Sequence, residues 1–133
     1  MVKNGGGEDI VSESMGTISM GGESASSNAI TVAKQMGIDL SGHMARHVTE
    51  DALEEFDKII VMENNHRDAV LRMVPSCESK VSLLGSYVPY PMAGDEIPDP
   101  IGMDPMAFRT CFSTIIEAVQ LFYKSILEEM EAR

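Results

Sequence analysis

The stretch KIIVMENNHRDAVLRMVPSCESKVSLL, residues 58–84, decides the fold class. It begins with KIIVM (58–62), a continuous apolar run with β-branched residues that is typical of a strand covered on both faces. A helix is expected over residues 64–73, and Pro75 ends it. KVSLL (80–84) then repeats the pattern of a buried strand. A strand, a helix and a second strand in this order predict two parallel neighbours in one sheet.

The segments before this unit add one more strand and two helices. DIVSES (9–14) predicts a short strand, and a helix is expected to start at one of the two serines of SSNAITVAKQM (26–36). Another helix is expected over EDALEEF (50–56), with Thr49 as its N-cap. The glycine-rich residues 1–8 are expected to form a flexible start.

After the second buried strand, a proline-rich loop over residues 85–104 leads into a long helix that starts at Pro105. Its apolar positions recur at helical spacing over about 25 residues, which predicts an amphipathic helix. We therefore expect one α/β domain over residues 1–133, a three-layer sandwich with a short parallel sheet. Ligands of such folds bind beyond the carboxyl ends of the strands, so the loop 85–104 is a candidate site.

The charge of the chain restricts its partners. Ten Lys and Arg residues against 21 Asp and Glu residues give a formal net charge of −11 at pH 7. Nucleic acids and anionic membranes are bound mainly through Lys and Arg, so neither is an expected partner. No apolar run reaches the roughly 18 residues that a membrane-spanning helix needs, and no signal peptide opens the chain.

The chain has two cysteines, Cys77 and Cys111. Two cysteines without a metal-ligand spacing make a disulfide scaffold or a zinc site improbable. We therefore expect no metal or other cofactor, and a cytoplasmic location is the default for such a chain.

Within the proline-rich loop, EIPDPIGMD (96–104) places the carboxylate of Asp99 between Pro98 and Pro100. A proline disfavours the α region for the residue before it, so Asp99 is held extended on a stiffened loop. Such a carboxyl group suits proton transfer. Without further context, an Asp-Pro turn on the surface is the simpler interpretation.

Six segments occur in an order that is similar to a known family: SMGT (14–17), ASSNAI (25–30), GIDLSGHMAR (37–46), VTEDALEEFDKIIVM (48–62), KVSLLGSY (80–87) and IPDP (97–100). Together they resemble the low-molecular-weight protein-tyrosine phosphatase family, which includes bacterial arginine phosphatases and related arsenate reductases. The resemblance covers about residues 9–126. It implies a two-step phosphomonoesterase that acts on a phosphorylated protein or a small phosphate ester.

In the mechanism that the resemblance implies, a cysteine thiolate attacks phosphorus and an aspartic acid of a D-P motif protonates the leaving oxygen. The same aspartate then acts as a base on the water that hydrolyses the phosphocysteine. Asp99 matches this aspartate. His43 matches a histidine that supports the phosphate loop, and Ser14 opens the turn near the active site. On the residues alone, His43 is equally well a surface histidine.

The expected pocket walls are Met20 and Ile101, where tyrosine-specific members of the family carry aromatic rings. Flexible apolar walls offer no stacking specificity, so phosphotyrosine, phosphoarginine and a small phosphate ester all remain open as substrates. Arg46 and His66 are expected on solvated faces.

The nucleophile that the resemblance implies lies in a C-x5-R signature, and this chain has none. The sixth residue after Cys77 is Leu83, and the sixth after Cys111 is Glu117, so both cysteines are expected to be structural. We expect that the first strand, the phosphate loop and the first helix of the family are missing, as in an N-terminally truncated member. Such a chain is expected to be inactive, and its exposed strand edges and apolar face favour self-association.

Three hypotheses follow. The first is a phosphatase that is encoded without its first segment, and the second is a non-catalytic remnant that acts as an interaction module. An in-frame C-x5-R signature upstream of Met1 would distinguish the first from the second. The third, an arsenate reductase, needs further redox cysteines and has no pairing signal in this sequence.

Overall fold

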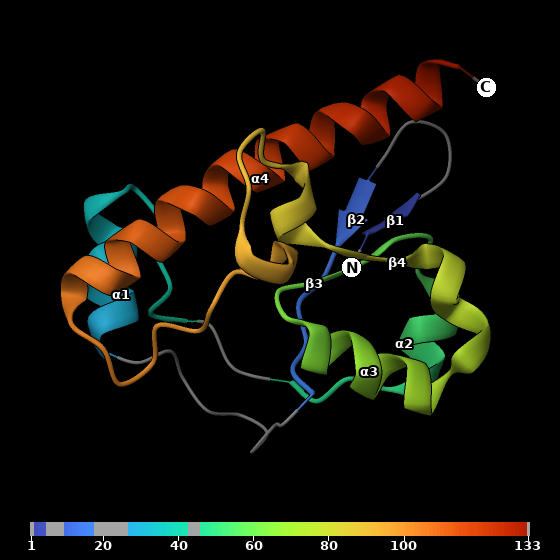
Figure 1. The fold of residues 1–133 in the computed structure, drawn as a ribbon, viewed down its shortest axis with the longest axis horizontal. Coiled ribbons are helices and arrows are strands. Elements are labelled where there is room, and N and C mark those ends of the chain that lie inside the picture. The colour runs from blue at the N-terminus through green and yellow to red at the C-terminus, as the bar shows by residue number, and fades with distance from the viewer. Residues whose placement is uncertain (1, 5–9, 18–26, 43–45, 133) are drawn as a thin grey trace.

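The computed structural model describes residues 2–4, 10–17, 27–42 and 46–132 (Figure 1). The described elements follow the chain in this order: β1 (Val2–Asn4), β2 (Ile10–Ser12), α1 (Ser27–Gln35), α2 (Glu50–Glu55), β3 (Ile59–Val61), α3 (Asn64–Met73), the 3₁₀ segment η1 (Pro75–Lys80), β4 (Val81–Leu83), the 3₁₀ segments η2 (Leu84–Tyr87) and η3 (Ala93–Asp95), and α4 (Pro105–Glu131).

The predicted strand–helix–strand unit is confirmed. β3 and β4 pair in parallel, with Ile59 opposite Val81 and Val61 opposite Leu83. α3 covers the residues that the sequence predicted, and Pro75 opens η1 directly after it.

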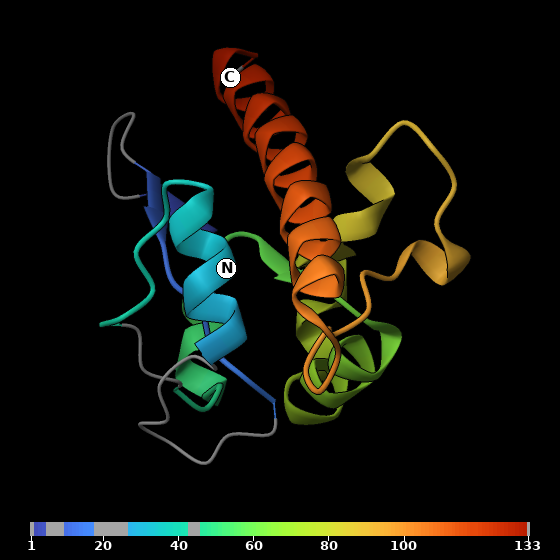
Figure 2. The same ribbon diagram turned by 90° about the vertical axis from the view of Figure 1, so that its left-hand side faces the viewer.

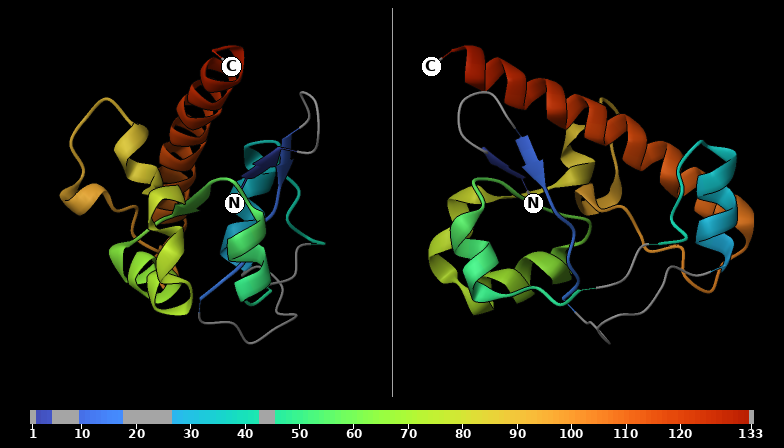
Figure 3. Two further views of the ribbon diagram at one scale, coloured as in Figure 1. Left: turned by 90° about the vertical axis from the view of Figure 1, so that its right-hand side faces the viewer. Right: turned by 180° about the vertical axis from the view of Figure 1, so that it is seen from behind.

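Helices cover β3 on both faces. Ile59 and Val61 belong to a buried cluster with residues of α2, α3 and η1, whereas Ile60 and Met62 pack against a second cluster that contains α4. This alternation follows the two-residue period of a strand. Figures 1 and 3 show α4 on one side of the strands and α2 and α3 on the other. The predicted α/β layering is therefore confirmed.

The helix boundaries agree with their local signals. Thr49 caps α2, since its hydroxyl oxygen accepts a hydrogen bond from the Ala52 N–H at 3.2 Å. Gly37 takes a positive φ of 83° just after α1. Asp104 caps α4 by accepting from the Ala107 N–H at 3.0 Å. Figure 2 shows α1 beside the N-terminal half of α4.

The N-terminal region differs from the prediction in two ways. Val2–Asn4, expected in a flexible start, form β1, which pairs antiparallel with β2. Residues 1 and 5–8 of that predicted start lie outside the described residues. Among the described strands, β2 pairs with β1 and not with β3, so the expected single parallel sheet is two separate pairs. β1 supplies backbone partners for one edge of β2, and the periodicity of the sequence does not reveal this pairing.

Candidate functional site

The loop that carries Asp99 is fixed at the carboxyl end of β3. The N–H of Ile97 donates to the carbonyl oxygen of Met62 at 2.9 Å, and the Ile97 side chain is buried in the cluster with α4. Asp99 itself is exposed, and its Oδ1 accepts a hydrogen bond from the Ile101 N–H at 2.9 Å. The sequence therefore predicted correctly that this loop lies at the carboxyl edge of the sheet.

A second tie joins the same loop to the start of α3. Oε1 of Glu96 accepts from the backbone N–H of Asn64 at 2.7 Å and from its side-chain amide at 3.2 Å. The amide of Asn64 also donates to the carbonyl oxygen of Gly94 at 3.3 Å. A carboxylate is favourable at the positive end of a helix. Glu96 thus caps α3 from a distant part of the chain and was not singled out from the sequence.

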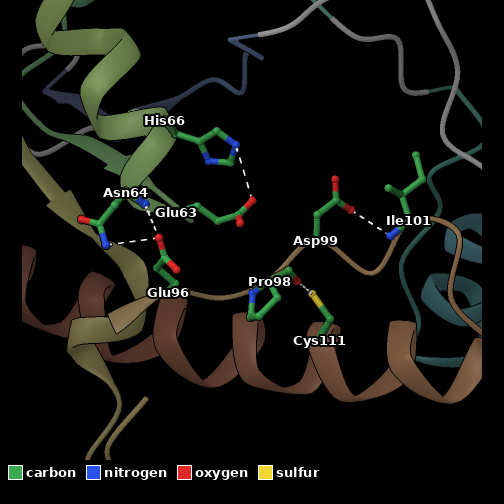
Figure 4. Close-up of polar contacts among 8 residues, drawn as sticks. All are labelled: Glu63, Asn64, His66, Glu96, Pro98, Asp99, Ile101 and Cys111. Atoms are coloured by element: carbon green, nitrogen blue, oxygen red, sulfur yellow. Dashed lines mark hydrogen bonds and ion pairs between the residues drawn. The ribbon is translucent and has the colours of Figure 1, made fainter. Parts of the chain in front are cut away.

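Cys111 lies on α4 beneath the Asp99 loop (Figure 4). Its Sγ faces the carbonyl oxygen of Pro98 at 3.8 Å, while the Asp99 side chain points away from α4. Burial and, secondly, the charge of Asp99 raise the pKa of the Cys111 thiol. A raised pKa leaves little thiolate near neutral pH, so Cys111 is placed as a packing residue rather than a nucleophile.

A cavity of about 560 Å³ lies beside β3, between it and the segment that begins at β2. The β2 side contributes Ser12, Ser14 and Gly16, among others, and the β3 side contributes all residues from Ile59 to Met62.

His66 also lines this cavity, and its Nε2 lies 3.7 Å from Oε1 of Glu63 (Figure 4). The His66 side chain is 31% exposed, so it lines the cavity and also remains in part on a solvated face, as expected.

The other predicted site residues have different outcomes. Ser14 lines the cavity, and its carbonyl oxygen accepts from the exposed guanidinium of Arg46 at 3.5 Å. Ile101 follows Asp99 with 69% of its surface exposed, so it is available as a pocket wall. Met20 and His43 lie outside the described residues.

The two cysteines lie in different clusters. Cys77 is 1% exposed in the cluster with α2 and α3, whereas Cys111 packs against the cluster with α4. This separation does not favour a redox pair. Among the described residues, no group of three or more His, Cys, Asp or Glu side chains is arranged to hold a metal ion. Within the same residues, none of the helices has the length and apolarity to cross a membrane.

Comparison with known sequences gives one family. The family model for low molecular weight phosphotyrosine protein phosphatases matches residues 1–132. A relative in Erwinia amylovora, described as a low molecular weight protein-tyrosine-phosphatase named AmsI, is 33% identical over 113 residues, which are 85% of this chain and 76% of that protein.

Solved structures agree with this result. The Erwinia amylovora AmsI structure superposes with a TM-score of 0.76 at 32% identity, covering 84% of this chain and 71% of that chain. The Vibrio vulnificus Wzb structure, in complex with benzylphosphonate, has a TM-score of 0.71 at 31% identity and covers 80% of this chain and 70% of that one. The YwlE arginine phosphatase from Geobacillus stearothermophilus has the same fold, with a TM-score of 0.76, 22% identity, and coverage of 91% and 77%.

Proposed function

The chain belongs to the low molecular weight phosphotyrosine protein phosphatase family, and from this premise we propose that Asp99 is the general acid and base of a phosphomonoesterase site. The observation that carries the proposal is the placement of the Asp-Pro loop. The Ile97–Met62 hydrogen bond fixes this loop at the carboxyl edge of β3, and the Asp99 carboxylate is exposed there.

In the proposed reaction, a cysteine thiolate attacks phosphorus while the bond from phosphorus to the leaving oxygen breaks. Asp99, protonated at this stage, transfers its proton to that oxygen. In the second step the Asp99 carboxylate takes a proton from water as the water attacks the phosphocysteine, which restores the thiolate. The hydrogen bond from the Ile101 N–H to Oδ1 leaves Oδ2 of Asp99 available for the proton.

The thiolate and the phosphate-binding arginine are proposed to come from a C-x5-R signature outside these 133 residues. Within the chain, Cys77 is buried and the raised pKa of Cys111 disfavours its thiolate. Residues 1–133 alone are therefore proposed to bind the leaving-group side of a substrate without turning it over. A thiolate nucleophile needs reducing conditions, which fits a cytoplasmic location.

For the substrate we propose a phosphorylated protein or a small phosphate ester. Because the Vibrio vulnificus relative is in complex with benzylphosphonate, an aryl phosphate is the first class to test. Ile101 supplies an apolar wall next to Asp99, without the ring that would stack on a tyrosine.

The test begins with the nucleotide sequence upstream of the codon for Met1. An in-frame C-x5-R signature is expected, and the protein expressed from that start is expected to hydrolyse p-nitrophenyl phosphate. In that protein, Asp99→Asn should lower kcat by about 10²- to 10⁴-fold, and Asp104→Asn, at the N-cap of α4, should leave kcat within about two-fold. An Asp99→Asn variant with unchanged kcat would contradict the proposal.

A second candidate function, a non-catalytic interaction module, is favoured by the apolar residues that α4 leaves uncovered. Stop codons directly upstream of Met1, together with a transcript that starts there, would support this candidate over the phosphatase.

A further inference from the structure

The loop before Asp99 contains two consecutive residues with a left-handed backbone. Gly94 has a φ of 64°, and Asp95, with a φ of 57°, is the one residue other than glycine with a positive φ in the described ranges. This conformation is unfavourable for a residue with a side chain, because its Cβ crowds the following carbonyl oxygen. It persists where neighbouring groups fix it, and such residues cluster at functional sites. The turn at Gly94 and Asp95 therefore depends on the groups that hold it.

The side chain of Asn64, the first residue of α3, closes this turn. Its amide nitrogen donates to the carbonyl oxygen of Gly94 at 3.3 Å and to Oε1 of Glu96 at 3.2 Å, so one amide joins the residues on either side of Asp95. The same Glu96 oxygen accepts from the backbone N–H of Asn64 at 2.7 Å (Figure 4). We call these three hydrogen bonds the Asn64–Glu96 clasp.

The clasp is more than a cap for α3. Glu63 occupies the N-cap position, and among the described residues its side chain makes no capping hydrogen bond but lies 3.7 Å from His66. The Asn64 N–H is instead bonded to a carboxylate 32 residues further along the chain. A residue at the N-cap would be enough to stabilise the helix alone. The use of Glu96 in its place joins the start of α3 to the Asp99 loop.

The chain between the clasp and Asp99 has little freedom. Only Ile97 and Pro98 separate Glu96 from Asp99. The N–H of Ile97 is bonded to the carbonyl oxygen of the residue after β3, and its side chain is buried. The ring of Pro98 fixes its own φ, and Pro100 restricts Asp99 to extended backbone. The position of the clasp therefore sets the position of the Asp99 carboxyl group.

Cys111 gives an independent measure of where this loop lies. Its Sγ is 3.8 Å from the carbonyl oxygen of Pro98, on the opposite side of the loop from the Asp99 side chain (Figure 4). Burial and, secondly, the charge of Asp99 raise the pKa of the Cys111 thiol. Both effects require the loop to rest on α4, so the reactivity of this thiol reports the position of the loop without any substrate.

We propose that Asn64 and Glu96 are positioning residues for Asp99: their clasp holds the left-handed turn and thereby fixes the carboxyl group at the carboxyl edge of β3. The positioning stands on the contacts of the clasp and of the loop. Its consequence for proton transfer to a leaving group rests on the proposed function.

The first experiment uses residues 1–133 and needs no turnover. Glu96→Ala removes the acceptor of two bonds of the clasp, whereas Glu96→Gln keeps an oxygen there without the charge. Exchange of the Ile97 N–H is measured relative to that of Ala118, buried on α4, so that a general loss of stability does not count. We expect it to be about ten-fold faster in Glu96→Ala and within about two-fold of the natural chain in Glu96→Gln.

The second experiment measures alkylation of Cys111 in the same variants at pH 8. Opening the clasp removes the burial and the negative charge that raise the pKa of this thiol, so more thiolate is present. We expect iodoacetamide to react about five- to ten-fold faster with Glu96→Ala and within about two-fold with Glu96→Gln. Asn65→Ala, exposed at the next position of α3, is the matched control and should leave the rate unchanged.

The third experiment tests the catalytic consequence in the protein that carries the upstream C-x5-R signature. Glu96→Ala should lower kcat/KM about ten-fold for p-nitrophenyl phosphate. The loss should be larger for phenyl phosphate, because its leaving oxygen is the stronger base and depends more on a proton from Asp99. A residue that only stabilised the fold would affect both esters equally.

Unchanged exchange at Ile97, or unchanged alkylation of Cys111, in Glu96→Ala would overturn the proposal. Equal losses for the two esters would overturn it as well, if Asp99→Asn affects phenyl phosphate more strongly. If Glu96→Ala moves the loop while neither it nor Asp99→Asn lowers kcat/KM, the proposed function fails and the positioning of Asp99 stands.

Discussion

Asp99 shows how far a single residue can be interpreted from its neighbours in the sequence. The two prolines beside it predicted a stiff loop, and the order of strands and helices predicted that this loop lies at the sheet edge. The Ile97–Met62 hydrogen bond confirms the position. The contact with Cys111 could not be predicted, because it joins the loop to a helix and depends on how both pack. Met20 and His43 lie outside the described residues, so their roles stay predictions.

The proximity of Asp99 to Cys111 predicts the pH dependence of thiol modification. The thiolate is the reactive form, and both burial and the Asp99 charge raise the pKa of Cys111, so alkylation should be slow at pH 7 and accelerate into the alkaline range. Asp99→Asn removes one of the two causes and lowers this pKa. The rate at pH 8 should therefore rise roughly two- to five-fold.

The measurement is iodoacetamide labelling, quantified separately for the peptides that contain Cys77 and Cys111. Glu131→Gln, at the far end of α4, is the control and should leave the rate unchanged. An Asp99→Asn variant that reacts more slowly than the natural chain would show that the loop does not lie over Cys111.

At the scale of elements, the sequence predicted what depends on local chemistry. Thr49 before α2, Pro75 after α3 and Pro105 at the start of α4 are signals that lie next to the boundaries they predict, and these boundaries agree with the structure. The partners that stabilise helix ends from a distance could not be predicted. Glu96 at the start of α3 is one case and Lys80 at the end of α2 is the other.

Lys80 is expected to stabilise α2 through its C-terminal carbonyl groups. Its Nζ donates to the carbonyl oxygens of Leu53, Glu54 and Phe56 at 2.8, 3.2 and 3.0 Å. Lys80→Met keeps the aliphatic stem and removes these bonds, so the free energy of unfolding should fall by about 1–2 kcal/mol.

Urea denaturation measures this loss, with Lys58→Met as the matched control. Lys58 pairs with Glu129 at 3.2 Å on the surface, where an ion pair contributes less than about 0.5 kcal/mol. Equal losses in the two variants would contradict the assigned capping role of Lys80.

Gly85 permits the close approach of η2 to η3. A Cβ at this position would overlap the carbonyl oxygen of Asp95, so Gly85→Ala should displace the loop that carries Asp99. We expect a loss of about 1–3 kcal/mol in the free energy of unfolding, as in other overpacked sites, and faster exchange of the Ile97 N–H.

Gly42→Ala provides the comparison for this prediction, because no atom of the described part of the chain lies within 4 Å of a Cβ there. Its stability should change by less than about 1 kcal/mol. A Gly85→Ala variant as stable as Gly42→Ala, with unchanged exchange at Ile97, would show that the loop does not need this glycine.

At the scale of the whole molecule, the sequence predicted the layers of helices and strands. It predicted exposed strand edges, but not that β1 and β2 form a pair separate from β3 and β4. The apolar patterns of the strands and of the amphipathic helix predict which of their faces are buried. No local pattern shows which apolar positions of the helix have no other element packed against them and stay exposed to solvent. Val119 and Tyr123 belong to the apolar stripe of α4 and are nevertheless exposed. Val119 also lines the cavity beside β3.

The uncovered stripe on α4 predicts self-association at high concentration. Sedimentation should show weak, reversible association of residues 1–133 in the range of about 0.1 mM. Replacing Tyr123 and Leu127 by Gln should suppress it, whereas replacing Ile101, in the loop, and Met106, in the first turn of α4, should not. A monomer at all concentrations, with a sharp thermal transition, would contradict this prediction.

The central claim is that Asp99 serves a phosphatase site whose nucleophile lies outside these 133 residues. The most direct measurement is hydrolysis of p-nitrophenyl phosphate by purified residues 1–133, compared with the Asp99→Asn variant. We predict that both proteins release p-nitrophenol no faster than the buffer does. Hydrolysis above this background that disappears in Asp99→Asn would contradict the claim, because the chain would then contain a nucleophile of its own.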